Sequence, residues 1–247
     1  MPDLKLTWLG HSTFLIDSPG GKRILVDPWT LNNPVCPEEF KHLERLDLML
    51  ITHGHFDHIS DAVEIARETS CQVVCIHETS LWLAGKGVKN IQGMNKGGNI
   101  PVLASSDGHG GIKVRMVDAR HSCGIQDGDQ IVYGGEAAGF VVTLEDGTKV
   151  YHSGDTALFG DMALIGERYA PDIALLPIGD LYTMDPADAA VAVDLLGVKQ
   201  VIPMHHSTFD ALPGKPEDFV RRVGSRARVV VLEPGQHLVF RNEAAVR

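Results

Sequence analysis

The stretch HGHFDH, residues 53–58, places four potential metal ligands within six residues. At the end of an extended strand, side chains at positions i and i+2 point the same way, so His53 and His55 can bind one ion. Asp57 and His58 follow at the entry to a predicted helix, from which they can turn toward a second ion. Imidazole and carboxylate together suit Zn²⁺ and other first-row divalent metals, so this stretch predicts a metal site.

Short apolar runs precede this stretch and three other polar segments. Residues 48–51 lead into it, residues 150–151 lead to Asp155, residues 173–176 to Asp180, and residues 201–204 to His205. Apolar runs of about four to eight residues suit strands that are buried on both faces. In α/β folds, ligands bind beyond the C-terminal ends of such strands. The sequence therefore predicts that these His and Asp residues gather at one edge of a sheet.

The rest of the chain supports a layered α/β fold with the helices outside. Residues 4–9, 14–16 and 24–26 read as a β-meander, with a turn at residues 19–21. Helices are predicted over residues 62–67 with Ser60-Asp61 as cap, over 187–196 between Pro186 and Gly197, and from Pro216 toward Val223. We expect residues 1–247 to form a single domain.

Composition narrows the function. The chain has 247 residues, 44% of them hydrophobic, and a net charge of −10 that leaves out 12 histidines. This composition excludes a disordered chain, and the acidic balance argues against nucleic-acid binding. We expect neither a membrane span nor a signal peptide. Because four cysteines are too few for a disulfide scaffold, a reducing, cytoplasmic location is expected.

The motif HxHxDH after an apolar strand resembles the metallo-β-lactamase superfamily. The resemblance narrows to its UlaG-like, UPF0173-type metal-dependent hydrolases and covers about residues 4 to 238. The segments that carry it are TWLGHSTF at 7–14, DPW at 27–29, GEAAGF at 135–140, SGDT at 153–156, LPIGD at 176–180 and PMH at 203–205. It implies a four-layer αβ/βα sandwich with the site at the sheet edges.

The resemblance also implies a complete ligand set. Metal 1 would be held by His53, His55 and His121, metal 2 by Asp57, His58 and His205, and Asp155 would bridge the two. His121 follows an apolar segment at residues 114–117 that reads as a strand. His109 competes for its role, but it lies in a glycine-rich segment that reads as an exposed turn.

Two divalent ions, two carboxylates and a bridging hydroxide would leave a small positive charge inside an acidic protein. A metal-bound water has a pKa of about 7, so the bridging hydroxide is the expected nucleophile at neutral pH. Zn is the expected metal, with Mn, Ni or Fe as options. We hypothesise that Asp57 orients the nucleophile and takes its proton. For His11, proton transfer and a structural hydrogen bond stay open.

Further residues are candidates for the substrate pocket or for support of the ligands. Asp27 is a candidate acceptor that fixes a ligand imidazole. His206 should point away from its neighbour His205, which favours a supporting role over ligation. The remaining candidates for the pocket, for each of which a structural role is at least as open, are Trp29, Glu136, Asp180, Tyr182 and Met184.

The leading hypothesis is a dinuclear hydrolase that cleaves a small ester or lactone, an amide or a phosphodiester. The resemblance favours a lactone or a phosphorylated small molecule. The alternatives are a non-heme iron redox enzyme and a non-catalytic metal sensor. Diiron reductases of the superfamily carry Glu where this chain has His55, and they need a flavin domain. The oligomeric state stays open, a homo-oligomer included.

Overall fold

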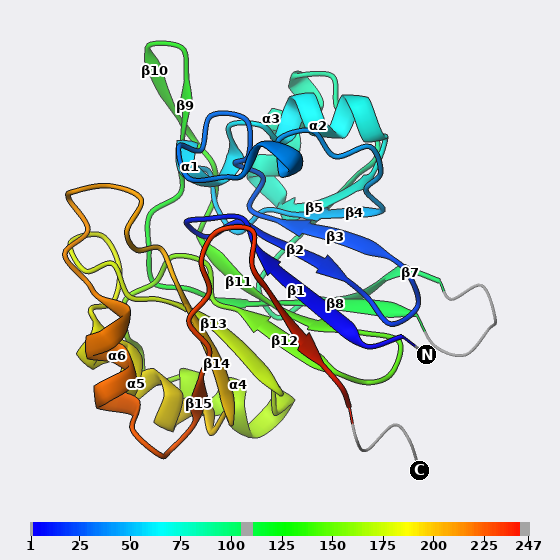
Figure 1. The fold of residues 1–247 in the computed structure, drawn as a ribbon. Coiled ribbons are helices and arrows are strands. Elements are labelled where there is room, and N and C mark those ends of the chain that lie inside the picture. The colour runs from blue at the N-terminus through cyan, green and yellow to red at the C-terminus, as the bar shows by residue number, and fades with distance from the viewer. Residues whose placement is uncertain (1, 105–110, 243–247) are drawn as a thin grey trace.

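The computed structural model describes residues 2–104 and 111–242. Two seven-stranded sheets pack face to face, and helices cover the outer face of each sheet (Figure 1). This is the predicted four-layer αβ/βα sandwich. A two-stranded hairpin, β9 (Gly124–Asp127) with β10 (Gln130–Tyr133), projects from the edge of the sandwich.

The first sheet has the strand order β16-β1-β2-β3-β4-β5-β6. Strands β1, β2 and β3 form the predicted antiparallel meander, and β3 to β6 run parallel. The strands are β1 (Leu4–Trp8), β2 (Phe14–Asp17), β3 (Arg23–Val26), β4 (Leu48–Leu50), β5 (Gln72–Ile76), β6 (Ile91–Met94) and β16 (His237–Phe240).

The second sheet has the strand order β15-β14-β13-β12-β11-β8-β7. Strands β12 to β15 run parallel, whereas β7, β8, β11 and β12 pair in antiparallel fashion. The strands are β7 (Asn99–Leu103), β8 (Ile112–Asp118), β11 (Ala138–Thr143), β12 (Lys149–His152), β13 (Ile173–Pro177), β14 (Gln200–Met204) and β15 (Arg228–Val229).

Continuous apolar runs mark strands that lie between two hydrophobic layers. In β4, Leu48 and Leu50 pack into the core between the sheets, while Met49 packs under the helices of the first sheet. In β13, Leu175 faces the core between the sheets, and Ala174 faces the helices of the second sheet. Alternate side chains point to opposite faces, and here both faces are apolar, so no polar residue interrupts the run.

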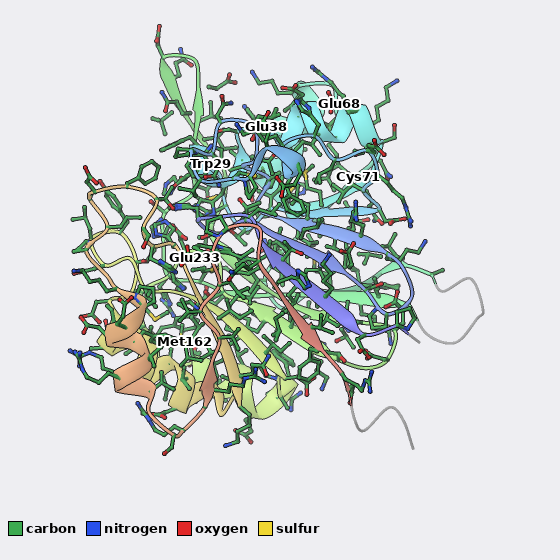
Figure 2. The ribbon with its side chains drawn as sticks, in the orientation of Figure 1. Trp29, Glu38, Glu68, Cys71, Met162 and Glu233 are labelled. Atoms are coloured by element: carbon green, nitrogen blue, oxygen red, sulfur yellow. The ribbon has the colours of Figure 1, made fainter. Side chains whose placement is uncertain are left out.

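The helices divide between the two outer layers. Against the first sheet lie α1 (Phe56–Ile59), α2 (Ala62–Thr69) and α3 (His77–Gly85), and against the second α4 (Met162–Tyr169), α5 (Pro186–Leu196) and α6 (Pro216–Val223). A short 3-10 turn, η1, covers Glu38–Phe40. Figure 2 shows these opposite layers, with Cys71 on the side of the first sheet and Met162 on the side of the second.

The predicted helices are present, with one difference at a cap. In α5, the carboxylate of Asp185 accepts hydrogen bonds from the first turn, and Gly197 ends the helix at a φ of 61°. Asp61 precedes α2, but its carboxylate makes no capping bond. It accepts instead from the backbone of Thr30 at 2.6 Å and of Leu31 at 2.8 Å. That side chain therefore fixes the loop after β3 rather than the helix.

The four cysteines are buried free thiols. Burial raises the pKa of the Cys36 thiol to about 12 and also raises that of Cys123. Neither thiol is activated as a nucleophile, since the thiolate is the reactive form. Within residues 2–104 and 111–242, no helix combines the length and the apolar character needed to cross a membrane.

Candidate metal centre

Three imidazoles converge beyond the ends of β4 and β8. The Nε2 atom of His53 lies 3.0 Å from Nδ1 of His55, and Nε2 of His121 lies 3.2 Å from that same Nδ1. Burial lowers the pKa of all three residues. The rings are therefore neutral at pH 7, with lone pairs that can bind a cation.

A second group of ligand atoms lies beside the first. Asp57 and His58 come from α1, and His205 follows β14. The Oδ2 atom of Asp57 is 3.9 Å from Nε2 of His58 and 3.9 Å from Nε2 of His205. The Nε2 atom of His11, from the β1–β2 loop, is close enough to belong to the same group.

Asp155, which follows β12, lies between the two groups. Its Oδ2 atom is 2.9 Å from Nε2 of His205, 3.4 Å from His58, 3.7 Å from His121 and 4.0 Å from His53. Burial opposes ionisation of this carboxyl, but His205 and His58 hold its pKa well below the usual value. One carboxylate oxygen thus faces ligands from both groups, as a bridging ligand would.

Asp27, at the end of β3, orients candidate ligands but is not in either ligand group. Its Oδ2 atom lies 2.7 Å from Nδ1 of His58 and accepts a hydrogen bond of 2.8 Å from the Thr52 hydroxyl. That hydroxyl lies 3.0 Å from Nδ1 of His53. The carboxylate therefore fixes the tautomer of His58 directly and that of His53 through Thr52, with Nε2 of each ring free to bind metal.

His58 provides the test of whether a metal fits. Its Nε2 atom is buried and makes no hydrogen bond, while its Nδ1 atom lies 2.7 Å from Oδ2 of Asp27. Burial would lower the pKa of His58, but the surrounding Asp155, Asp27 and Asp57 raise it well above the usual value. This concentration of negative charge calls for a cation, and the mixed nitrogen and oxygen donors fit first-row divalent ions.

Three residues of the site have a strained backbone conformation. His11, Asp27 and His205 have φ values of 57°, 52° and 54°, in the left-handed region that side chains with a Cβ rarely adopt. The carbonyl of His11 accepts hydrogen bonds from the backbone of His205 at 3.0 Å and from the Trp8 indole at 2.8 Å. These contacts hold the loops in place, and such strain is common at functional sites.

A hydrogen-bonded chain links His11 to Asp57. The His11 Nε2 atom lies 2.9 Å from Oδ2 of Asp57, and its Nδ1 atom lies 3.1 Å from the Thr208 hydroxyl. Burial lowers the pKa of His11 to about 4, so the ring is neutral. Burial raises the pKa of Asp57, but His58 and the His11 hydrogen bond outweigh it and lower that pKa to about 2. The ionised carboxylate therefore accepts from Nε2–H of His11.

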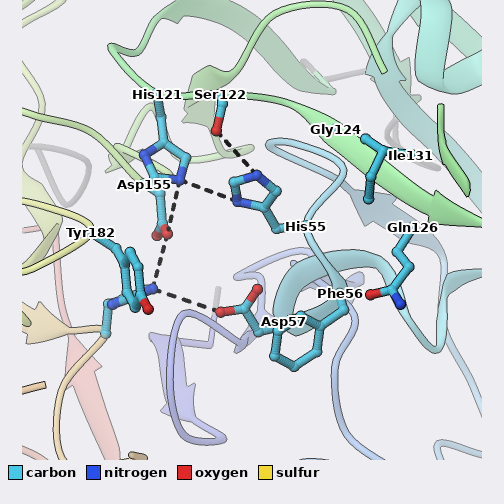
Figure 3. Close-up of a pocket in the computed structure, with 11 residues that line it drawn as sticks. His55, Phe56, Asp57, His121, Ser122, Gly124, Gln126, Ile131, Asp155 and Tyr182 are labelled. Atoms are coloured by element: carbon cyan, nitrogen blue, oxygen red, sulfur yellow. Dashed lines mark hydrogen bonds and ion pairs between the residues drawn. The ribbon is translucent and has the colours of Figure 1, made fainter. Parts of the chain in front are cut away.

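A cavity of about 390 Å³ opens onto the ligands (Figure 3). The candidate metal ligands His55, Asp57, His121, Asp155 and His205 line it. Tyr182, one of the predicted pocket residues, forms one wall, and the β9–β10 hairpin forms the facing wall with Gln126 and Ile131. Phe56, within the metal-binding stretch itself, lies beside Asp57 at the rim.

Two other predicted residues lie near the site without lining this cavity. Trp29 is buried, with its ring 5.3 Å from that of His11 and stacked 5.8 Å from that of Phe209. His206 points away from His205, as expected. Its ring lies 5.0 Å from that of Trp8, and both residues line a separate cavity.

Three further predicted pocket residues also lie outside the cavity lining. Met184 is buried in the core between the second sheet and its helices. Asp180 is exposed and accepts a hydrogen bond from the backbone of Leu181, so it shapes its own turn. The Glu136 carboxylate turns outward to Lys96, 2.5 Å away. The directions of these side chains depend on packing that the motifs do not encode.

The sequence interpretation missed the residues contributed by the hairpin and by hydroxyls. Ile131, Gln126, Thr52 and Thr208 carry no motif of their own. Thr52 had one available signal, since it precedes His53 directly and a metal-binding imidazole needs a partner for its second nitrogen. His109, the alternative ligand, lies outside the described residues.

A family model described as a beta-lactamase superfamily domain matches residues 22–206. The chain is 56% identical over 220 residues to a UPF0173 metal-dependent hydrolase of Koribacter versatilis, covering 89% of this chain and 91% of the relative. It is 49% identical over 238 residues to a UPF0173 metal-dependent hydrolase of Rubrobacter xylanophilus, covering 95% and 96%.

Among solved structures, the fold is similar to that of a metallo hydrolase from the hyperthermophilic archaeon Ignicoccus hospitalis. The TM-score is 0.83 at 39% sequence identity, and the match covers 97% of this chain and 99% of that one. The similarity therefore extends over both sheets and both helical layers.

Proposed function

Since this chain belongs to the UPF0173 metal-dependent hydrolases of the beta-lactamase superfamily, we propose that it binds two divalent ions and cleaves a small ester or lactone, an amide or a phosphodiester. The position of Asp155 carries the proposal of two ions. Its Oδ2 atom lies within 4.0 Å of Nε2 atoms from both ligand groups. A site for one ion would not need a shared carboxylate between two sets of imidazoles.

Divalent ions at such a site lower the pKa of water and stabilise the negative charge that develops on the attacked oxygen. Side chains of the protein accept the proton and hold the acceptor in place. The Asp57 carboxylate lines the cavity, is ionised, and is held in one orientation by His11. We assign Asp57 as the proton acceptor and His11 as its positioning residue, with the Thr208 hydroxyl 3.1 Å from Nδ1 of His11.

The cavity favours a small molecule as the partner of this site. Its volume of about 390 Å³ lies in the range of ordinary small-ligand pockets. The net charge of −10 is unsuited to holding a long polyanion. A compact substrate that reaches the metal ligands through this opening is therefore the proposed partner.

The experiment combines metal analysis with a hydrolysis screen. The protein is loaded with defined amounts of Zn, Mn, Ni or Fe, and its metal content is measured alongside turnover of esters, lactones, amides, β-lactams and phosphodiesters. Two bound equivalents and turnover that rises with the second equivalent are expected. Full turnover with one equivalent would refute the dinuclear proposal. Oxygen uptake by the iron form without any hydrolysis would indicate redox chemistry instead.

A further inference from the structure

We propose that the cavity selects substrates with an uncharged, apolar arm, which packs between the β9–β10 hairpin and Tyr182. The inference rests on the proposed hydrolase function and names its substrate class. It favours neutral esters or lactones with an alkyl or aryl substituent over phosphorylated or otherwise anionic molecules.

Large apolar side chains stand exposed around the rim of the cavity. Ile131 is 74% exposed, Tyr182 61% and Phe56 51%. They come from the hairpin, the β13–α5 loop and α1, three elements far apart in the sequence. In Figure 3, Tyr182 lies on one side of the metal ligands, and Phe56 and Ile131 lie on the other. An arm that enters between them would remove these apolar surfaces from water.

The charge of the cavity wall also favours an uncharged arm. Among residues 2–104 and 111–242, no lysine or arginine lines the cavity, and its charged side chains are the metal-binding Asp57 and Asp155. Nearby cations are held elsewhere: Lys86 pairs with Asp127, and Arg120 pairs with Asp118. Beyond the metal ligands, the wall offers the Gln126 amide and the hydroxyls of Ser122 and Tyr182. An anionic group away from the metals would find no positive partner.

The hairpin wall is fixed in position. Ile125 is fully buried and packs against Gly54 of the metal-binding stretch, where a Cβ would collide with it. The Asp127 carboxylate accepts hydrogen bonds of 2.9 Å from Trp82 on α3 and of 2.6 Å from Lys86, the residue that follows α3. Cross-strand pairing with Gln126 then places Ile131 on the cavity side of the hairpin. The wall is thus set at a defined distance from the metal ligands.

The test is a series of neutral p-nitrophenyl esters from acetate through butyrate and hexanoate to octanoate, with the anionic succinate monoester for comparison. The metal-loaded full chain is expected to gain about two- to fourfold in kcat/KM per added methylene until the arm fills the cavity. Turnover that is independent of chain length, or fastest with the succinate ester, would overturn the inference while leaving the hydrolase function intact.

Substitution of the wall sharpens this test. We expect Ile131→Lys to reduce the hexanoate-to-acetate preference by about fivefold or more and to improve turnover of the succinate ester. The matched control is Val239→Lys, because Val239 is 53% exposed on β16 and does not line the cavity. An equal effect of both variants, or a change of oligomeric state with unchanged preference in Ile131→Lys, would refute the role of Ile131.

A binding measurement separates the two proposals if no ester is hydrolysed. Alkyl hydroxamates carry a metal-chelating head on an apolar arm, and their affinity for the metal-loaded protein can be measured by calorimetry. Affinity that rises from acetohydroxamate to octanohydroxamate and falls in Ile131→Lys would support the apolar arm even without turnover. Affinity that is independent of chain length would refute it.

Discussion

The two sheets contribute to the metal centre in different ways. The first sheet supplies His53, His55, Asp57 and His58 from six consecutive residues after β4. The second supplies His121, Asp155 and His205 singly, each after a different strand. The first set is determined largely by local chain geometry, and the second depends on the pairing of β8, β11, β12, β13 and β14. The second sheet therefore decides whether two ligand groups become one centre.

Loss of Asp155, the proposed bridging ligand, should have the largest effect. Asp155→Asn removes the charge shared by both ligand groups, while the amide fills the same space. We expect the loss of at least one metal equivalent and a fall in kcat/KM beyond about 100-fold, more than substitution of an outer partner typically costs. Metal analysis and kinetics measure this. Retention of two equivalents with full activity would contradict the bridging role and the importance of the second sheet.

Asp27→Asn tests the support beneath the first sheet's ligands. The carboxylate fixes His58 directly and His53 through Thr52. Its loss should weaken metal affinity by about 10–100-fold, measured by competition with a chelator. The control is Asp47→Asn, since the Asp47 carboxylate accepts a hydrogen bond from the backbone N–H of Arg23 at the opposite end of β3. An equal loss in both variants would show that the effect is one of general stability.

His11 contacts ligands from both sheets. Its carbonyl accepts a hydrogen bond from the backbone of His205, and its ring is hydrogen-bonded to Asp57. Asn tolerates the positive φ of this position but cannot extend to Asp57. We expect His11→Asn to lower kcat about tenfold or more, with KM little changed and both metal equivalents retained. Loss of one equivalent would identify His11 as a metal ligand instead of a positioning residue.

The smallest effect is expected at Glu136, a pocket candidate from the sequence. Its carboxylate pairs with Lys96 outside the cavity. Glu136→Gln should change kcat/KM by less than about twofold, because exposed ion pairs contribute little. A large loss of kcat/KM with an unchanged melting temperature would show that Glu136 belongs to the substrate site.

Much of the fold follows from local patterns. The apolar run at residues 48–51 and the meander at residues 4–26 were predicted because strands between two apolar layers leave a continuous signal. The Pro186–Gly197 helix was predicted from its end residues. Helices α3 and α4 were not predicted, and neither has a side-chain capping bond at its first turn. Asp61 stands at the N-cap of α2 as predicted, but its carboxylate binds a nearby loop instead of the helix.

The sequence alone determined which kinds of ligand this protein carries and that strand ends deliver them, because donor chemistry and the spacing of residues 53–58 are local properties. Only the tertiary structure decided which oxygen lies between the two groups, that Ile131 and Tyr182 face each other across the opening, and that Glu136 turns away. These relations join residues distant in the chain. They depend on how two sheets and their loops pack, which no local pattern records.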